Sequence, residues 1–342
     1  MMNSNIVNNS MVNGSEELDC EAAILELGTS VMQPWSVPGR YVYCSVSLTL
    51  SVAILFGNCL VIYAVVKFKK LQTRPNAYIV SLAFSDIALA VLLFPLHLYE
   101  TWNMRWDLPV WMCKIRVVLE VGLIQVSMFN LCAVAIERYL SVCHPFKHQF
   151  ISHRITGVII ALCWIIPSFT WIIYDLSGWH YLGIEFHMYC LNQAGKCIHL
   201  LNTDDNAIPS ILFFLVPGFV IVVAYWKIFA TARRHAREIR TLTQTQEQRK
   251  KNRDYLGNTK AAKVLGVVVA CFFISWMPVN VTYKIDIDTN YELVPALLID
   301  VLVWLGFANS MMNPIVYYIF SQDFKIAFKT IIGLKTVTME DN

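Results

Sequence analysis

Residues 41–66 of the chain read YVYCSVSLTLSVAILFGNCLVIYAVV, an apolar stretch without a single Asp, Glu, Lys or Arg. A helix needs about 20 apolar residues to cross a bilayer, so this stretch is long enough to do so. Two similar blocks each contain one acid, Asp86 in residues 75–99 and Glu120 in residues 117–136. Four more blocks are free of charge: 155–174, 206–226, 264–283 and 301–322.

The composition of the whole chain agrees with a membrane protein. Hydrophobic residues make up 56% of the 342 residues, charged residues only 15%, and the mean hydropathy is +0.51. Inside a bilayer each block must be a helix or part of a closed barrel, because the backbone has to satisfy its own hydrogen bonds. The alternating ten-residue strands of a barrel are not present. The sequence therefore predicts an all-α membrane protein, a bundle of seven transmembrane helices.

The basic residues indicate how the bundle lies in the membrane. If the N-terminus is outside, the cytoplasmic segments hold 21 of the 27 Lys and Arg residues, and 14 of the 24 acids lie outside. The positive-inside rule favours this orientation. We expect an outer tail over residues 1–40, without a cleavable signal sequence, the helix bundle over residues 41–320, and an inner tail over residues 321–342. Sequons predict glycosylation of the outer tail at Asn8 and Asn13.

Four of the ten cysteines lie outside or at outer helix ends: Cys20, Cys113, Cys190 and Cys197. An even number in an oxidising compartment indicates two disulfides, with three possible pairings, and four free thiols are the alternative. At the other end of the chain, Phe324, Phe328 and Ile331 recur at helical spacing beside two lysines. This pattern predicts a short amphipathic eighth helix on the inner leaflet.

Each predicted helix carries a short motif, and none of these motifs is a strong signal alone. In chain order they are Gly57-Asn58, Ser81-Leu82-Ala83 with Asp86, Glu137-Arg138-Tyr139, Trp164, Pro217 with Tyr225, Phe272 with Trp276-Met277-Pro278, and Asn313-Pro314-Ile315-Val316-Tyr317. With all seven in order over nearly its whole length, the chain resembles the rhodopsin-type (class A) G-protein-coupled receptors. The resemblance implies a plasma-membrane receptor for a heterotrimeric G protein, with the stimulatory type favoured, and not an enzyme.

Asp86 is an acid within the membrane, so we expect it to face the bundle interior, where its charge is less costly. The resemblance implies that it holds an allosteric sodium ion, and no other cofactor is expected. The implied sodium pocket consists of Asp86, Ser127, Asn309, Ser310 and Asn313. The alternative is a protonated, hydrogen-bonded core aspartate.

The inner ends of the helices carry the expected switch. The resemblance assigns coupling to Glu137, Arg138 and Tyr139, toward which Tyr225 and Tyr317 would turn on activation. Helix bending at prolines would take part in the same switch, or the prolines shape a static bundle. The prolines are Pro217, Pro278 and Pro314, and the resemblance adds Phe272 of the sixth helix to the switch. Basic residues between 233 and 253 either contact the G protein or only set the orientation.

One departure from the family lies at the inner end of the sixth helix. Many relatives have an acid there that pairs with the arginine of the third helix, whereas this chain has Asn258. We therefore expect raised ligand-independent signalling.

Glu120 lies seven residues inward of Cys113, about 10 Å below the outer end of the third helix. A lone carboxylate at that depth needs a cation, and the outer halves of helices four to seven contain no Lys or Arg. The sequence therefore predicts that the ammonium group of a ligand pairs with Glu120. The alternative is that Glu120 is protonated, or bonded to Trp304 or a water.

Residues 304–310, WLGFANS, resemble the seventh helix of the aminergic branch. Within that branch residues 260–266 and 294–302, together with Cys20, are most similar to the trace-amine-associated receptors. This likeness implies the bridges Cys113–Cys197 and Cys20–Cys190, and leaves olfaction or internal signalling open. Phe307 departs from the tyrosine that is usual there, and Asn280 either contacts the ligand or bonds within the bundle. The predicted ligand-binding residues are Glu120, Val121, Ile124, Trp276, Val279, Asn280, Trp304 and Phe307, with Asp204, Asp205 and Asp300 at the rim.

The fifth helix offers one hydroxyl, Ser210, which argues against a simple catecholamine. The rim acids favour a diamine or polyamine, or only steer cations to the mouth. We therefore predict a receptor for a small cationic amine, which would be a trace amine, diamine or polyamine; a peptide or lipid ligand is the alternative. Contact with membrane lipids is expected and contact with nucleic acid is not. Residues 293–322 contain no lysine for retinal, which excludes a light receptor.

Overall fold

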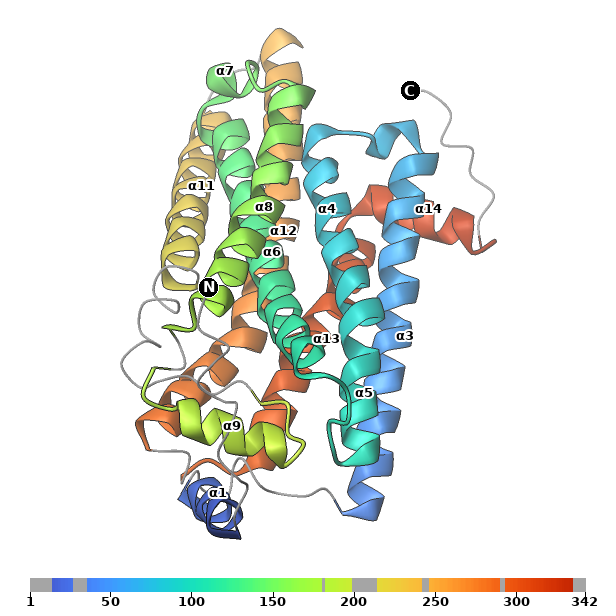
Figure 1. The fold of residues 1–342 in the computed structure, drawn as a ribbon. Helices are drawn as coiled ribbons and strands as arrows, with labels where there is room; N and C mark the ends of the chain where they lie inside the picture. The colour runs from blue at the N-terminus through green and yellow to red at the C-terminus, as the bar shows by residue number, and fades with distance from the viewer. Residues whose placement is uncertain are drawn as a thin grey trace.

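The structure, a computed structural model, describes residues 14–26, 36–179, 182–198, 214–241, 246–289 and 293–334. These ranges contain helices and no strand, and seven of the helices are long and apolar enough to cross a membrane. The seven lie side by side as a bundle (Figure 1). The predicted all-α, seven-helix membrane fold is confirmed.

The first span is α3 (Val37–Lys67), and the second is α4 (Arg74–Ala88) with its continuation through η2 (Leu89–Leu93) and α5 (Phe94–Asn103). The other five are α6 (Val110–Cys143), α8 (His153–Ser177), α11 (Val216–Thr241), α12 (Gln246–Asp288) and α13 (Ala296–Phe320). Most of these helices are longer than the apolar blocks that predict them, because polar residues at the membrane surface continue the helix. The seventh span begins after Pro295, before the charge-free block 301–322, and therefore includes Asp300.

Local sequence signals explain where several helices begin. The Ser152 hydroxyl accepts a hydrogen bond from the backbone N–H of Ile155 and caps α8 at 3.3 Å. Ser36 caps α3 in the same way, with Pro38 in the first turn, where a missing N–H costs nothing. These caps satisfy backbone donors that have no partner within the helix.

The second span is not a uniform α-helix. Residues Leu89–Leu93 form one π-helical turn immediately before Pro95. Proline lacks the N–H that an α-helix needs at that point, and a widened turn accommodates the change. This turn sets the direction in which His97 and Glu100 of α5 point.

The helix α6 is the centre of the bundle. It contacts α4, α8, α11 and α12, and polar as well as apolar side chains along it are buried. Close packing elsewhere depends on glycine: a Cβ on Gly57 of α3 would lie 2.9 Å from Cγ of Pro314 in α13. A side chain there would push these two helices apart.

Short helices distinguish the two ends of the bundle. At one end α1 (Gly14–Glu26) lies beside α9 (Glu185–Gln193), and both disulfides are found there; we call this the disulfide end (Figure 1). At the other end, the α7 end, lie α7 (Pro145–His148) and α14 (Gln322–Ile331).

The helix α14 is the short amphipathic helix that the sequence predicts. It runs across the bundle, not along it, and contacts α3, η1 (Lys69–Leu71) and α13 (Figure 1). Phe324 and Phe328 are buried, and the Phe324 ring stacks on Tyr317 with 5.3 Å between centroids. Asp323 forms an exposed ion pair with Lys70 at 2.9 Å. One face of α14 therefore covers the end of the bundle.

Candidate functional site

The structure contains the two disulfides that the family resemblance implies. Cys113 at the start of α6 is bonded to Cys197 in the segment after α9, and Cys20 of α1 is bonded to Cys190 of α9. Around the second bridge, Ala23, Ile24 and Leu191 form a small buried cluster of their own. The two bridges hold the segment between α8 and α11 against α6 and α1 at the disulfide end.

Glu120 lies below the first bridge and is in contact with two basic side chains of the protein. Its Oε2 is 3.5 Å from Nη1 of Arg116 and 3.5 Å from Nε2 of His97. The expectation that the protein supplies no cation to Glu120 is therefore wrong. Arg116 is one helical turn away on the same helix, and His97 comes from the bent second span. About a fifth of the Glu120 side chain stays exposed, so a ligand retains access to this carboxylate.

Arg116 joins three segments of the chain through one buried guanidinium group. It donates hydrogen bonds to the carbonyl oxygen of Cys197 and, at 3.2 Å, to Sγ of the same residue. Its Nη2 lies 3.7 Å from Oε2 of Glu100, while Oε1 of Glu100 accepts from the Cys197 N–H at 3.2 Å. The ring of Trp106 lies 5.8 Å from the guanidinium carbon. We call Arg116, Glu120, Glu100 and His97 the outer charge cluster.

The outer charge cluster extends toward α13 through Asp300. This half-buried acid interacts electrostatically with both His97 and Glu100. Tyr43 of α3 and Tyr283 of α12 each interact electrostatically with Glu120 and with Asp300. Ionisable groups from five membrane spans therefore converge on one region of the disulfide end.

Aromatic residues of the predicted ligand site pack next to this cluster. Phe307 lies 5.9 Å from the His97 ring, 5.3 Å from Phe94 and 6.0 Å from Trp276. Trp304 packs on Tyr43 at 4.7 Å. Nε1 of Trp304 has no hydrogen-bond partner within the described ranges, so Trp304 is not the residue that binds Glu120 there.

Four of the remaining predicted ligand residues lie within the described part of the chain. Asn280 donates to the carbonyl oxygen of Trp276 at 2.8 Å, a bond within its own helix, and Val279 is buried. Val121 and Ile124 on α6 are half-buried. Several other predicted residues lie outside the described part of the chain. They are the rim acids Asp204 and Asp205, the hydroxyl residue Ser210, the sequon residues Asn8 and Asn13, and the side chain of Asn258.

Near the middle of the membrane Asp86 is fully buried and accepts two hydrogen bonds from α13. Ser310 Oγ donates to Oδ1 at 2.6 Å, and Asn313 Nδ2 donates to Oδ2 at 2.9 Å. The hydroxyl of Ser127 pairs instead with Ser85 at 3.0 Å. Among the residues that the structure describes, Oδ1 of Asn309 and Oδ1 of Asn313 are buried without a hydrogen-bond partner.

At the α7 end Glu137 and Arg138 form an ion pair of 2.9 Å, and both are buried. Glu137 also contacts Nε2 of His148 in α7 at 2.8 Å, a partner that the sequence did not suggest. The hydroxyl groups of Tyr225 and Tyr317 have no hydrogen-bond partner in the described part of the chain. Arg138 is therefore paired within its own helix, and neither tyrosine is bonded to it.

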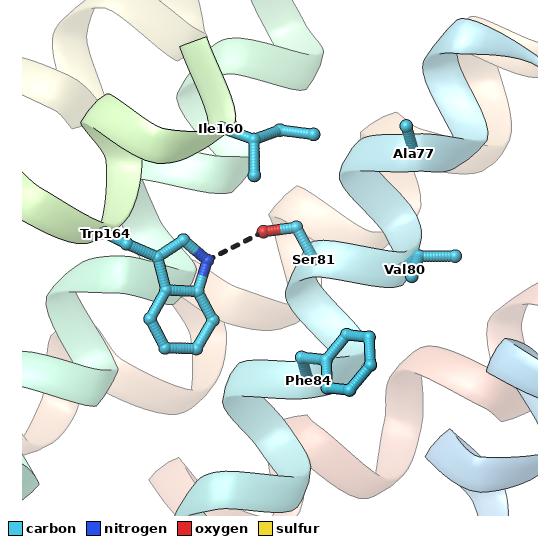
Figure 2. A pocket seen from close by; sticks show the side chains of 6 residues that line it. All are labelled: Ala77, Val80, Ser81, Phe84, Ile160 and Trp164. Atoms are coloured by element: carbon cyan, nitrogen blue, oxygen red, sulfur yellow. Dashed lines mark hydrogen bonds between the residues drawn. The ribbon is translucent and has the colours of Figure 1, made fainter. Parts of the chain in front are cut away.

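One groove lies away from these sites, on the flank of the bundle between α4 and α8. It has a volume of about 420 Å³ and is lined by Ala77, Val80, Ser81, Phe84, Ile160 and Trp164. Figure 2 shows the indole of Trp164 directed toward Ser81, whose hydroxyl accepts its hydrogen bond at 2.9 Å. The motif residues of the second and fourth spans are thus bonded to each other, and this apolar groove is separate from the outer charge cluster.

Comparison with known proteins gives the family. The sequence pattern described as "7 transmembrane receptor (rhodopsin family)" matches residues 57–317, most of the chain. The chain belongs to the rhodopsin family of seven-transmembrane receptors. It is therefore a receptor and not an enzyme, as the seven motifs predict.

Similar members of the family include two kinds of receptor. The 5-hydroxytryptamine receptor 4 of Cavia porcellus is 33% identical over 307 residues, which cover 84% of this chain and 78% of that protein. Trace amine-associated receptor 6 of Homo sapiens is 30% identical, with 89% of each chain covered. Trace amine-associated receptor 9 of Rattus norvegicus is 32% identical, with 90% of each chain covered. The predicted resemblance to aminergic receptors is confirmed.

Proposed function

We propose that this receptor binds a small cationic amine at the outer charge cluster and passes the signal to a heterotrimeric G protein. The observation that carries the proposal is the charge balance around Glu120. Arg116 contacts two carboxylates, Glu120 and Glu100, and a third, Asp300, interacts electrostatically with Glu100 and His97. A partly buried site with excess negative charge is stabilised by a ligand ammonium group.

The relatives support the same class of ligand. Their names identify receptors of 5-hydroxytryptamine and of trace amines, both of which are amines. The excess of acids in the outer charge cluster also suits a ligand with two ammonium groups, so diamines and polyamines belong among the candidates. Peptide and lipid ligands are the alternative that the test below would reveal.

Orientation and coupling complete the proposal. The distribution of Lys and Arg favours an orientation with the disulfide end and the N-terminus outside, where Asn8 and Asn13 would be glycosylated. The family resemblance favours the plasma membrane as the location. The α7 end, with Arg138 of α6, would then meet the G protein, for which the family resemblance favours the stimulatory type.

A sodium ion is proposed near Asp86. Hard cations prefer oxygen ligands, and Asp86, Ser310 and the two amide oxygens of Asn309 and Asn313 offer such ligands in a buried place. Ser127 would need to leave Ser85 in order to contribute. An ion there would supply the positive charge that a buried carboxylate requires.

The test of the amine proposal is second-messenger output from cells that express the wild type or Glu120→Gln, challenged with monoamines, diamines and polyamines. Glutamine keeps the shape and removes the charge, so we expect amine potency to fall about 10- to 100-fold. The matched control is Glu185→Gln, an exposed acid of α9 at the same end, which should respond as the wild type does. Amine responses that are equal in Glu120→Gln, or the lack of any amine response, would favour a peptide or lipid ligand.

A further inference from the structure

His97 is the histidine of the outer charge cluster, and histidine is the residue type that serves most often as a proton-dependent switch near neutral pH. Its Nε2 lies 3.5 Å from Oε2 of Glu120, the same oxygen that Nη1 of Arg116 approaches at 3.5 Å. Only 15% of the His97 side chain is exposed, against 22% for Glu120. A histidine in this position supplies a second positive charge to Glu120 whenever it binds a proton.

The groups around His97 come from five helices. On its own helix α5 lies Glu100, which interacts with Asp300 and, through Arg116, with Glu120. From α6 come Arg116, whose Nη1 is 3.4 Å from Nδ1 of the ring, and Glu120. From α13 come Asp300, which interacts electrostatically with the ring, and the apolar face of Phe307. Beyond Glu120 and Asp300, Tyr43 of α3 and Tyr283 of α12 complete the set of titratable groups.

These neighbours have opposite charges. The carboxylates Glu120, Glu100 and Asp300 would attract a positive charge on the ring, and the guanidinium of Arg116 would repel it. In the neutral ring Nδ1 accepts from Nη1 of Arg116 and Nε2 donates toward Oε2 of Glu120. A second proton, on Nδ1, would keep the contact with Glu120 but would place two donors opposite each other at Arg116.

We propose that His97 is an internal competitor for Glu120, so that the receptor responds to amines more weakly as the outside becomes acidic. The proposal rests on the amine-binding function above. A ligand ammonium group and a protonated His97 need the same carboxylate, and Arg116 already lies against it. Adding a third cation there is electrostatically costly, and binding the ligand therefore disfavours the proton, just as the proton disfavours the ligand.

The strength of this competition follows from linkage. When one proton competes with one ligand, the ligand's potency falls by up to tenfold for each pH unit below the pKa of the competing group. Between outside pH 8 and pH 5.5 we therefore expect amine potency to fall about tenfold. Simple primary alkylamines keep their positive charge over the whole range, so they are suitable probes.

The experiment measures concentration-response curves of a primary alkylamine at outside pH 5.5, 6.5, 7.4 and 8 in cells that express the wild type, His97→Gln or His97→Lys. Surface expression is measured for each variant, and output is normalised to direct activation of the same messenger at each pH. His97→Gln keeps a hydrogen-bonding side chain and should show a potency that no longer depends on pH. His97→Lys carries a permanent charge and should show low potency at every pH.

A matched control is His187→Gln, a histidine on α9 at the same end but outside the outer charge cluster. This variant should keep the wild-type pH dependence. If the wild type responds to the amine with the same potency at every pH, or if His97→Gln retains the full pH dependence, His97 is not a competitor. Lack of any amine response in the wild type at all four pH values would instead refute the proposed amine function.

Discussion

The substitution Arg116→Gln tests whether the outer charge cluster stabilises the receptor. The change removes a buried guanidinium that bonds the Cys197 carbonyl oxygen and contacts Glu120 and Glu100. Glutamine cannot replace the positive charge, so Glu100 and Glu120 both lose the arginine, while His97 remains beside Glu120. We expect a large decrease in the free energy of unfolding, because unpaired charges are expensive away from water.

The size of the effect follows from burial. Removing one partner of a fully buried ion pair costs about 3–5 kcal/mol. Here the arginine side chain is 7% exposed, but the two glutamates are 22% and 24% exposed and keep some hydration. We therefore expect a loss of about 2–3 kcal/mol, which corresponds to a decrease of about 3–4 °C in melting temperature for a protein of this size.

The assay is thermal unfolding of the purified receptor in detergent, with Arg105→Gln as the control. Arg105 lies at the same end and pairs with Asp107 at 2.9 Å, but both side chains are more than half exposed. Such a surface pair contributes about 0–1 kcal/mol, so this control should melt close to the wild type. Equal melting temperatures for Arg116→Gln and Arg105→Gln would show that the outer charge cluster does not hold the disulfide end together.

Two further predictions concern the middle of the bundle. Gly57→Ala places a Cβ 2.9 Å from Pro314 and should lower the free energy of unfolding by about 1–3 kcal/mol. The control is Gly157→Ala, where the added carbon meets no atom within 4 Å and should not destabilise the protein. Thermal melts of the two variants and the wild type give the comparison. Asp86→Asn removes the charge of the proposed sodium site, so antagonist or agonist affinity that changes with sodium concentration in the wild type should become independent of sodium. Sodium dependence that persists in Asp86→Asn would place the ion elsewhere.

The helices of the bundle could be predicted because the cost of an unsatisfied backbone in lipid leaves few alternatives. A run such as residues 41–66 has to be a helix, and its apolar length decides that it spans the membrane. The interior position of Asp86 could be predicted on similar grounds, since an acid within the membrane must face the interior of the bundle. The hydrogen bonds from Ser310 and Asn313 agree with that interior position.

The immediate partners of Glu120 were not predicted, for two physical reasons. Arg116 lies just outside the apolar block 117–136 that predicts the third helix, although its spacing of four residues puts it one helical turn from Glu120. His97 depends on the π-helical turn before Pro95, which rotates every later residue of the second span. A run of apolar residues does not reveal such a turn. His148 was missed because its contact with Glu137 depends on the path of the segment after α6.

The uninterrupted α6 has a consequence for the pharmacology of this receptor. Glu120 and Arg138 lie on the same helix, 18 residues or about 27 Å apart, whereas α12 and α13 contain Pro278 and Pro314 and are the elements able to bend. On the proposed function, an ammonium group that binds only Glu120 would gain the same free energy in the resting and the active receptor, and would shift neither population. Affinity would then depend on the charged end of a ligand, and efficacy on the part that reaches Trp276 and Phe307. Antagonists are expected among amines too short to touch that aromatic pair.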